Sequence, residues 1–274
     1  MKLAVKHYHW FWLSGLALLL VLLPFLTALG ALGSYMGAID WQLLRTDPYL
    51  RGVIWFSLWQ ALLSTLISVG LAVPLSRALA RRHFPGRDLL LQIFSVALVV
   101  PAIVAVFGLV VVHGRQGWVN GLLTSLDWSS GSYLYGLTGI LLAHVFFNLP
   151  LATRIILQRM QSVPPESWRL AQQLGMSSWQ HWRLLEWPHV RMVLAPVAAL
   201  VFALCFTSFA VVMSLGGGPK ATTLEVAIYQ AVRLDFDLPL ATQLSLVQLL
   251  LCGLILWLGI RLGRPTVINP SLGL

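Results

Sequence analysis

Six long apolar segments constrain the fold more than any other feature of this sequence. They cover approximately Trp10–Met36, Val53–Ala80, Leu89–His113, Tyr135–Leu157, Met192–Leu215 and Leu240–Leu262. At about 1.5 Å per helical residue, each segment is long enough to cross about 30 Å of hydrocarbon. Only 10% of the residues are charged and 58% are hydrophobic, which is typical of a polytopic membrane protein. We therefore predict an all-α fold with six transmembrane helices, forming one domain over residues 1–274.

The net charge of +9 is unevenly distributed between the loops. In a soluble protein such a charge would suggest a nucleic-acid partner, but membrane proteins gather Lys and Arg in their cytoplasmic loops. Thirteen of the 18 basic residues fall on one side of the predicted spans. The other side has Arg45, Arg51, Arg115, Lys220 and Arg233. This bias predicts that both termini and the loop at 164–188 are cytoplasmic, with membrane lipid and no nucleic acid around the chain.

That loop, PPESWRLAQQLGMSSWQHWRLLEWP, is the longest polar interruption in the chain. Pro165 suits the first position of a helix, and Gly175 can take the left-handed conformation that ends one. Ser177 and Gln180 form a capping-box pattern that starts a second helix, and Pro188 is expected to stop it. Aromatic residues favour interface cores, and the loop holds four tryptophans: Trp168, Trp179, Trp182 and Trp187. The pattern predicts two short docking helices rather than a solvated loop.

The loop resembles the EAA loop of ABC-importer permeases, whose pattern is EAA, three residues, Gly, nine residues and I-x-L-P. Ala171, Gly175, Leu185 and Pro188 fall at matching positions. Arg169 and Leu170 stand where Glu and Ala are expected, Trp187 replaces Leu, and the nearest acid is Glu166. The resemblance implies the type I permease fold, with coupling helices that contact cytoplasmic ATPase subunits. The implied contact residues are Glu166, Arg169, Ala171, Gly175, Met176, Ser177, Leu185 and Pro188.

Other segments extend the resemblance over most of the predicted spans. FFNLP and LGGGP-x-x-TTLE-x-AIYQ are similar to permeases for thiamine, ferric ion and related substrates. Over its whole length the chain is most similar to the N-terminal half of permeases from thiamine importers, which are about twice as long and contain two fused units. The resemblance implies thiamine transport, with ferric ion as the alternative. It also implies a second permease unit, fused or separate, a periplasmic binding protein, and a place in the bacterial inner membrane.

Six residues are candidates for the substrate path. His144 and Asn148 are four residues apart, so they share one helix face. Aromatic rings and an acid would suit a cationic aromatic substrate such as thiamine. The candidates are Trp59, His144, Phe147, Asn148, Glu225 and Tyr229. For each of them, packing or an interface is the alternative role, and for His144 and Asn148 a satisfied structural pair is favoured over a ligand site.

Catalytic chemistry is not indicated by any motif in the sequence. Gly216–Gly218 and Lys220 lack the Lys-Ser/Thr pair of a phosphate-binding loop. Cys205 and Cys252 lie in apolar segments without metal-ligand spacing. We therefore expect no catalytic residue, metal or cofactor in this chain, and ATP with Mg²⁺ only on the partner ATPase. An ion-coupled secondary transporter remains a lesser alternative, because the nine acids fall at loops or span ends rather than within spans.

Overall fold

The computed structural model describes residues 4–35, 40, 42–126, 133–216, 218 and 221–263. Within this part of the chain every regular element is helical, which confirms the all-α prediction. Six helical stretches in it are long and apolar enough to cross a membrane. They are Ser14–Ser34, Pro48–Arg81, Ala102–Ser125, Leu137–Gln161, Ser178–Phe206 and Leu238–Leu262. Met36, Gly217 and Lys220, which entered the sequence predictions, lie outside the described residues.

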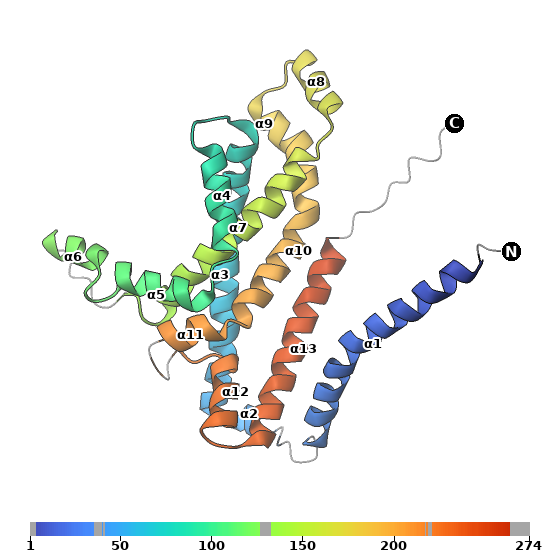
Figure 1. Ribbon diagram of the computed structural model, residues 1–274. Coiled ribbons are helices and arrows are strands. Elements are labelled where there is room, and N and C mark those ends of the chain that lie inside the picture. The colour runs from blue at the N-terminus through green and yellow to red at the C-terminus, as the bar shows by residue number, and fades with distance from the viewer. Residues whose placement is uncertain are drawn as a thin grey trace.

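The elements follow one another along the chain as shown in Figure 1. They are α1 (Ala4–Ser34), α2 (Leu43–Thr46), α3 (Pro48–Arg81), α4 (Arg87–Ala97), α5 (Ala102–His113), α6 (Trp118–Ser125), α7 (Leu137–Gln161), α8 (Pro165–Gln173), α9 (Ser178–Gln180), the π-helix η2 (His181–Glu186), α10 (Trp187–Phe206), α11 (Phe209–Leu215), α12 (Leu224–Arg233) and α13 (Leu238–Leu262).

The core of the bundle is formed by α3, α7 and α10, with α13 packed against α10. Ala61, Ala152, Val201 and Phe206 have no exposed surface in this core. Several buried positions of α3 carry serine, which lets neighbouring backbones approach closely without leaving a gap. By contrast, α1 stands to one side of the bundle, and its described side chains are mostly exposed (Figure 1).

The third predicted span, Leu89–His113, is two helices rather than one. The first, α4, ends at Ala97, and α5 begins at Ala102 after Pro101. Proline has no N–H to donate, and it disfavours the helical conformation of the residue before it. Pro101 therefore accounts for the break between the two helices. The apolar length on this part of the chain runs on through α5 and α6 instead.

The fifth predicted span, Met192–Leu215, is also divided, because α10 ends at Phe206 and α11 begins at Phe209. The observed helix also begins earlier than the predicted span, at Ser178 rather than Met192. The prediction that Pro188 stops the second loop helix is wrong, since the helix continues from Ser178 to Phe206 with Pro188 inside it.

A π-helix explains how this continuation is possible. Through η2 the backbone bonds span one residue more than in an α-helix, and the N–H of Trp187 donates to the carbonyl of Trp182. Pro188 then falls in the first turn of α10, where a missing N–H costs little. The wider turn avoids the clash that proline would cause inside a regular α-helix.

Candidate coupling surface and translocation cavity

The turn that joins α8 to α9 projects from one end of the bundle, opposite the end that carries α12 (Figure 1). We call α8, this turn and α9 the tip. Gly175 has a φ of +60°, in the left-handed region that the sequence predicted. Its N–H donates to the carbonyl of Gln172 at 3.1 Å, and the N–H of Met176 donates to the carbonyl of Ala171 at 3.0 Å. This pair of bonds is the Schellman motif, which satisfies the last carbonyls of α8.

The predicted capping box at the start of the second loop helix is also present. The Ser177 hydroxyl accepts from the N–H of Gln180 at 3.3 Å, and the Gln180 side chain accepts from the N–H of Ser177 at 2.6 Å. These bonds satisfy backbone groups that the sharp turn would otherwise leave without partners. The turn at Gly175 and the helix after it are therefore locally determined and well defined.

The tip exposes large apolar side chains outside the predicted spans. Leu170, Leu174 and Trp179 are 57%, 69% and 65% exposed. An apolar group of this kind on a part of a protein that lies outside the bilayer marks an interaction surface. Glu166 and Arg169 are exposed beside it, whereas Ala171 is buried under it.

The structure does not bring all the predicted contact residues to this surface. Met176 and Ser177 lie in the tip, but Leu185 and Pro188 are half-buried in the helix that leads from the tip into the bundle. Leu185 and Pro188 therefore support the base of the tip rather than its exposed face.

One residue of the loop that sequence reasoning missed is Glu186. Its side chain is buried, and it accepts a hydrogen bond from Nε of Arg77 at 2.8 Å and another from Nε of Arg81. Both arginines come from the last turns of α3. The two arginines are four residues apart, so their shared helix face could have been recognised in the sequence. No sequence pattern indicates that Glu186 would meet them.

A cavity of about 480 Å³ lies between the α4–α5 break, α7 and the α10–α11 break. His144, Phe147 and Asn148 line it together with Ser208. We call it the His144 cavity. Small-molecule sites commonly have a volume of about 300–1,000 Å³ and apolar walls with few polar groups, and this cavity fits both criteria. Three of the six predicted path residues are thus brought together here.

Hydrogen bonds fix the imidazole of His144 in this cavity. The Ser208 hydroxyl donates to the carbonyl of Cys205 at 2.9 Å, so it accepts from Nε2 of His144 at 2.6 Å. The other nitrogen, Nδ1, lies 2.9 Å from the Ser64 hydroxyl and accepts from it. Both ring nitrogens of a neutral imidazole are then satisfied. The amide of Asn148 donates to the carbonyl of His144 at 2.9 Å and contacts the sulfur of Cys205 at 3.3 Å.

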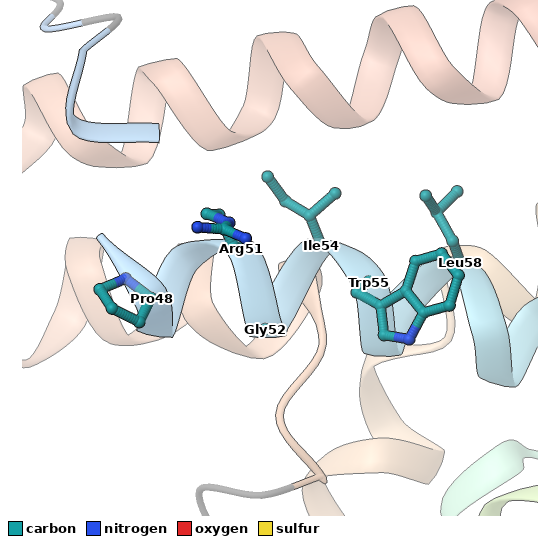
Figure 2. A pocket seen from close by; sticks show the side chains of 6 residues that line it. All are labelled: Pro48, Arg51, Gly52, Ile54, Trp55 and Leu58. Carbon is teal, nitrogen blue, oxygen red and sulfur yellow. The ribbon is translucent and has the colours of Figure 1, made fainter. Parts of the chain in front are cut away.

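Trp59 lies away from this cavity, on an exposed face of α3. Its ring stacks on that of Trp55, with centroids 6.4 Å apart and planes 8° from parallel. Trp55 lines a separate pocket of about 560 Å³ together with Pro48, Arg51, Gly52, Ile54 and Leu58. Figure 2 shows Ile54 and Leu58 projecting to the same side of α3 within this pocket. Arg51 brings a positive charge to this pocket, which disfavours a cation there.

Glu225 and Tyr229 form a third group on α12. Burial raises the pKa of the Glu225 carboxyl, and a hydrogen bond from the amide of Gln248 at 2.5 Å opposes that shift. The ring of Tyr229 packs against Phe209 with centroids 5.1 Å apart. Both residues join α12 to its neighbours, and neither lines the His144 cavity. Among the described residues, no cluster of three or more His, Cys, Asp or Glu side chains could hold a metal ion.

Comparison with known proteins places this architecture in a family. The model of the binding-protein-dependent transport system inner membrane component matches residues 72–264, which include the tip and the His144 cavity. The chain belongs to this family of ABC-importer permeases. It is therefore a multi-pass inner-membrane protein whose role is transport rather than catalysis.

Within the permease family, the chain is similar in sequence to several thiamine transport permeases. The chain is 54% identical over 220 residues to the thiamine transport system permease protein ThiP of Escherichia coli, and 45% identical over 225 residues to that of Haemophilus influenzae. These matches cover 79% and 82% of this chain but only 41% and 42% of the relatives. The chain thus matches less than half of the length of either relative.

Solved permease structures share the fold. The structure of a bacterial ABC transporter that imports the acidic polysaccharide alginate covers 96% of this chain with a TM-score of 0.79 at 18% identity. The MetNI methionine transporter in an inward-facing conformation covers 82% with a TM-score of 0.63 at 15% identity. Both likenesses concern the fold alone.

Proposed function

We propose that this permease forms part of the route by which an ATP-driven importer carries thiamine across the inner membrane. The observation that carries the proposal is the identity of about half of all residues with ThiP over most of this chain. Thiamine combines aromatic rings with a positive charge. The His144 cavity offers the ring of Phe147, neutral hydrogen-bonding groups and, among its lining residues, no Lys or Arg that would repel a cation.

Three partners follow from this assignment. Cytoplasmic ATPase subunits, which hold ATP and Mg²⁺, dock on the exposed apolar side chains of the tip. A second permease unit, either fused or a separate chain, completes the pathway, and a periplasmic binding protein delivers the substrate. ATP binding and hydrolysis shift the permease between two conformations, and each partner acts through its different affinity for the two.

The position of the tip supports a cytoplasmic location for both termini. The excess of Lys and Arg on one side of the spans supports a cytoplasmic tip. The Ser34 end of α1 and the Leu238 end of α13 lie at the opposite end of the molecule (Figure 1). Both helices therefore run with their terminal ends toward the side of the tip.

The test is the ATPase activity of the complex purified through this chain and placed in lipid vesicles with its binding protein. We expect thiamine-loaded binding protein to stimulate hydrolysis and unloaded protein to have a smaller effect. Stimulation by a ferric-ion binding protein alone would replace thiamine with the alternative substrate. A chain that purifies without any ATPase would overturn the importer assignment of the tip.

A further inference from the structure

We propose that Glu186, Arg77 and Arg81 form a clamp that fixes the tip to α3 and transmits its movement to the His144 cavity. The proposal deepens the function proposed above, since it names the residues that position the coupling surface. None of the three residues belongs to the pattern by which the loop was compared with ABC-importer permeases.

The Glu186 carboxylate is buried and pairs with both arginines. Its side chain is 2% exposed, and each of its two oxygens is bound by a different arginine. A buried carboxylate costs free energy unless it is paired, so the two arginines are required for this packing. The arginine side chains themselves are about one-third exposed, at 31% and 32%, and therefore lose less hydration.

Each arginine also contacts a tryptophan of the loop. The guanidinium of Arg81 lies 4.0 Å from the ring centroid of Trp168 on α8. That of Arg77 lies 5.1 Å from the ring centroid of Trp182 on η2. Planar guanidinium groups stack well on aromatic faces, which lysine does less well. One clamp thus contacts both loop helices at once.

Arg77 also bonds directly to the start of the second loop helix. Nη2 of Arg77 donates to the carbonyl of Ser178 at 2.8 Å and lies 3.3 Å from its hydroxyl. Ser178 follows the capping-box residue Ser177, so this bond fixes the helix end that immediately follows the Gly175 turn. The arginines therefore hold the tip at α8 and at α9, and they also hold η2, which follows it.

The helix to which the tip is fixed, α3, also reaches the His144 cavity. Arg77 and Arg81 end the same helix, α3, that carries Ser64, the partner of His144. A helix rises about 1.5 Å per residue, so Arg77 and Ser64 are about 20 Å apart along α3, which continues through Pro74 between them. A displacement at Arg77 therefore reaches Ser64 along one continuous helix. Movement of the tip thereby acts on the hydrogen bond that orients the cavity imidazole. Glu186 is a positioning residue in this scheme and touches no substrate.

The first experiment measures the position of the tip in the whole chain without any partner. Spin labels are placed at Gln172→Cys on α8 and Leu262→Cys at the end of α13, both exposed, after replacement of Cys205 and Cys252 by alanine. In lipid nanodiscs we expect one narrow distance distribution for the parent. Glu186→Gln should broaden it or add a second population, because two arginines then lack their shared carboxylate.

Asp88→Asn is the matched control. It also removes one acid from an ion pair with an arginine, but its side chain is 87% exposed, so the distribution should not change. Glu186→Asp keeps the charge and should restore much of the parent distribution. Arg81→Gln, at a third-exposed position, serves as the second test if Glu186→Gln does not fold. An unchanged distribution in a folded Glu186→Gln or Arg81→Gln variant would overturn the clamp.

The second experiment separates positioning from general stability. In the reconstituted complex, Glu186→Gln should retain ATP hydrolysis but transport about tenfold less substrate per ATP, a loss that corresponds to about 1.4 kcal/mol of coupling. Equal losses of hydrolysis and transport would mean a purely structural role and would refute the proposal. The distance measurement requires neither ATPase nor thiamine, so failure of the proposed function would leave its result intact.

Discussion

Gly175 shows how a single residue determines the shape of the tip. Its φ of +60° is strained for every residue with a Cβ, although a side chain there would meet no atom within 4 Å. The constraint is therefore conformational and not a matter of space. The cost of the left-handed region is about 1–2 kcal/mol for an ordinary residue, less for asparagine and more for a β-branched one.

The residue-scale prediction follows from this difference. Gly175→Val should leave membrane insertion intact but distort the turn, so that uptake falls while ATP hydrolysis persists. Gly175→Asn adds a side chain similar in size to valine, but asparagine tolerates positive φ, so this variant should retain most of the uptake. The measurement is substrate uptake and ATP hydrolysis in the same vesicles. Normal uptake by the valine variant would contradict the coupling role of the turn.

Close packing between two elements depends on glycine in another way. A Cβ added at Gly259 of α13 would lie 2.2 Å from the Cβ of Ala199 on α10. The two helices can approach this closely because both carry small residues at the crossing. Gly253, six residues earlier in the same helix, has no atom within 4 Å of an added Cβ.

These two glycines give a matched prediction at the scale of elements. Gly259→Ala should destabilise the bundle by about 1–3 kcal/mol, because α10 and α13 must separate to admit the methyl group. Gly253→Ala should be neutral or stabilising, since alanine is favoured over glycine in a helix by about 1 kcal/mol. Thermal unfolding of the two purified variants in one detergent compares them directly. Equal midpoints would show that the contact adapts without cost.

In the molecule as a whole, the tip and the loop between α12 and α13 lie at opposite ends of the bundle (Figure 1). The Lys and Arg bias predicts that the tip is cytoplasmic and that the loop between α12 and α13, which contains Asp235, lies on the outer side.

This orientation is testable by chemical labelling of intact cells. In a chain whose native cysteines are replaced, Asp235→Cys should react with a membrane-impermeant maleimide added outside. Gln172→Cys should react only after the membrane is opened, because it lies on the tip. Both positions are exposed, so differences in burial do not explain a difference in labelling. The reverse pattern would invert the predicted topology.

Much of the tip could be predicted because its determinants are local. Pro165, Gly175 and the Ser177–Gln180 pair act on backbone groups within a few residues. Pro188 was misjudged because its effect depends on whether the preceding turn widens into a π-helix. That widening occurs where η2 is held by the clamp, and no local rule indicates it.

The candidate substrate path divides differently. His144, Phe147 and Asn148 share a cavity because the helical period places them on one face of α7. Trp59, Glu225 and Tyr229 were grouped with them by chemical type alone, and the packing of α3 and α12 separates them. Residue type indicates what a side chain can bind, but helix rotation decides what it faces.

The number of apolar segments, their helical form and the turn of the tip follow from the sequence alone, because hydrophobic length and capping act within one segment. The partners of Glu186 follow only from the packing of the helices, because Arg77 is 109 positions away and Arg81 is 105 positions away. That packing also decides that the breaks after α4 and after α10 meet around His144. Contacts over such separations depend on how whole helices pack, and helix packing is a property of the bundle rather than of any one segment.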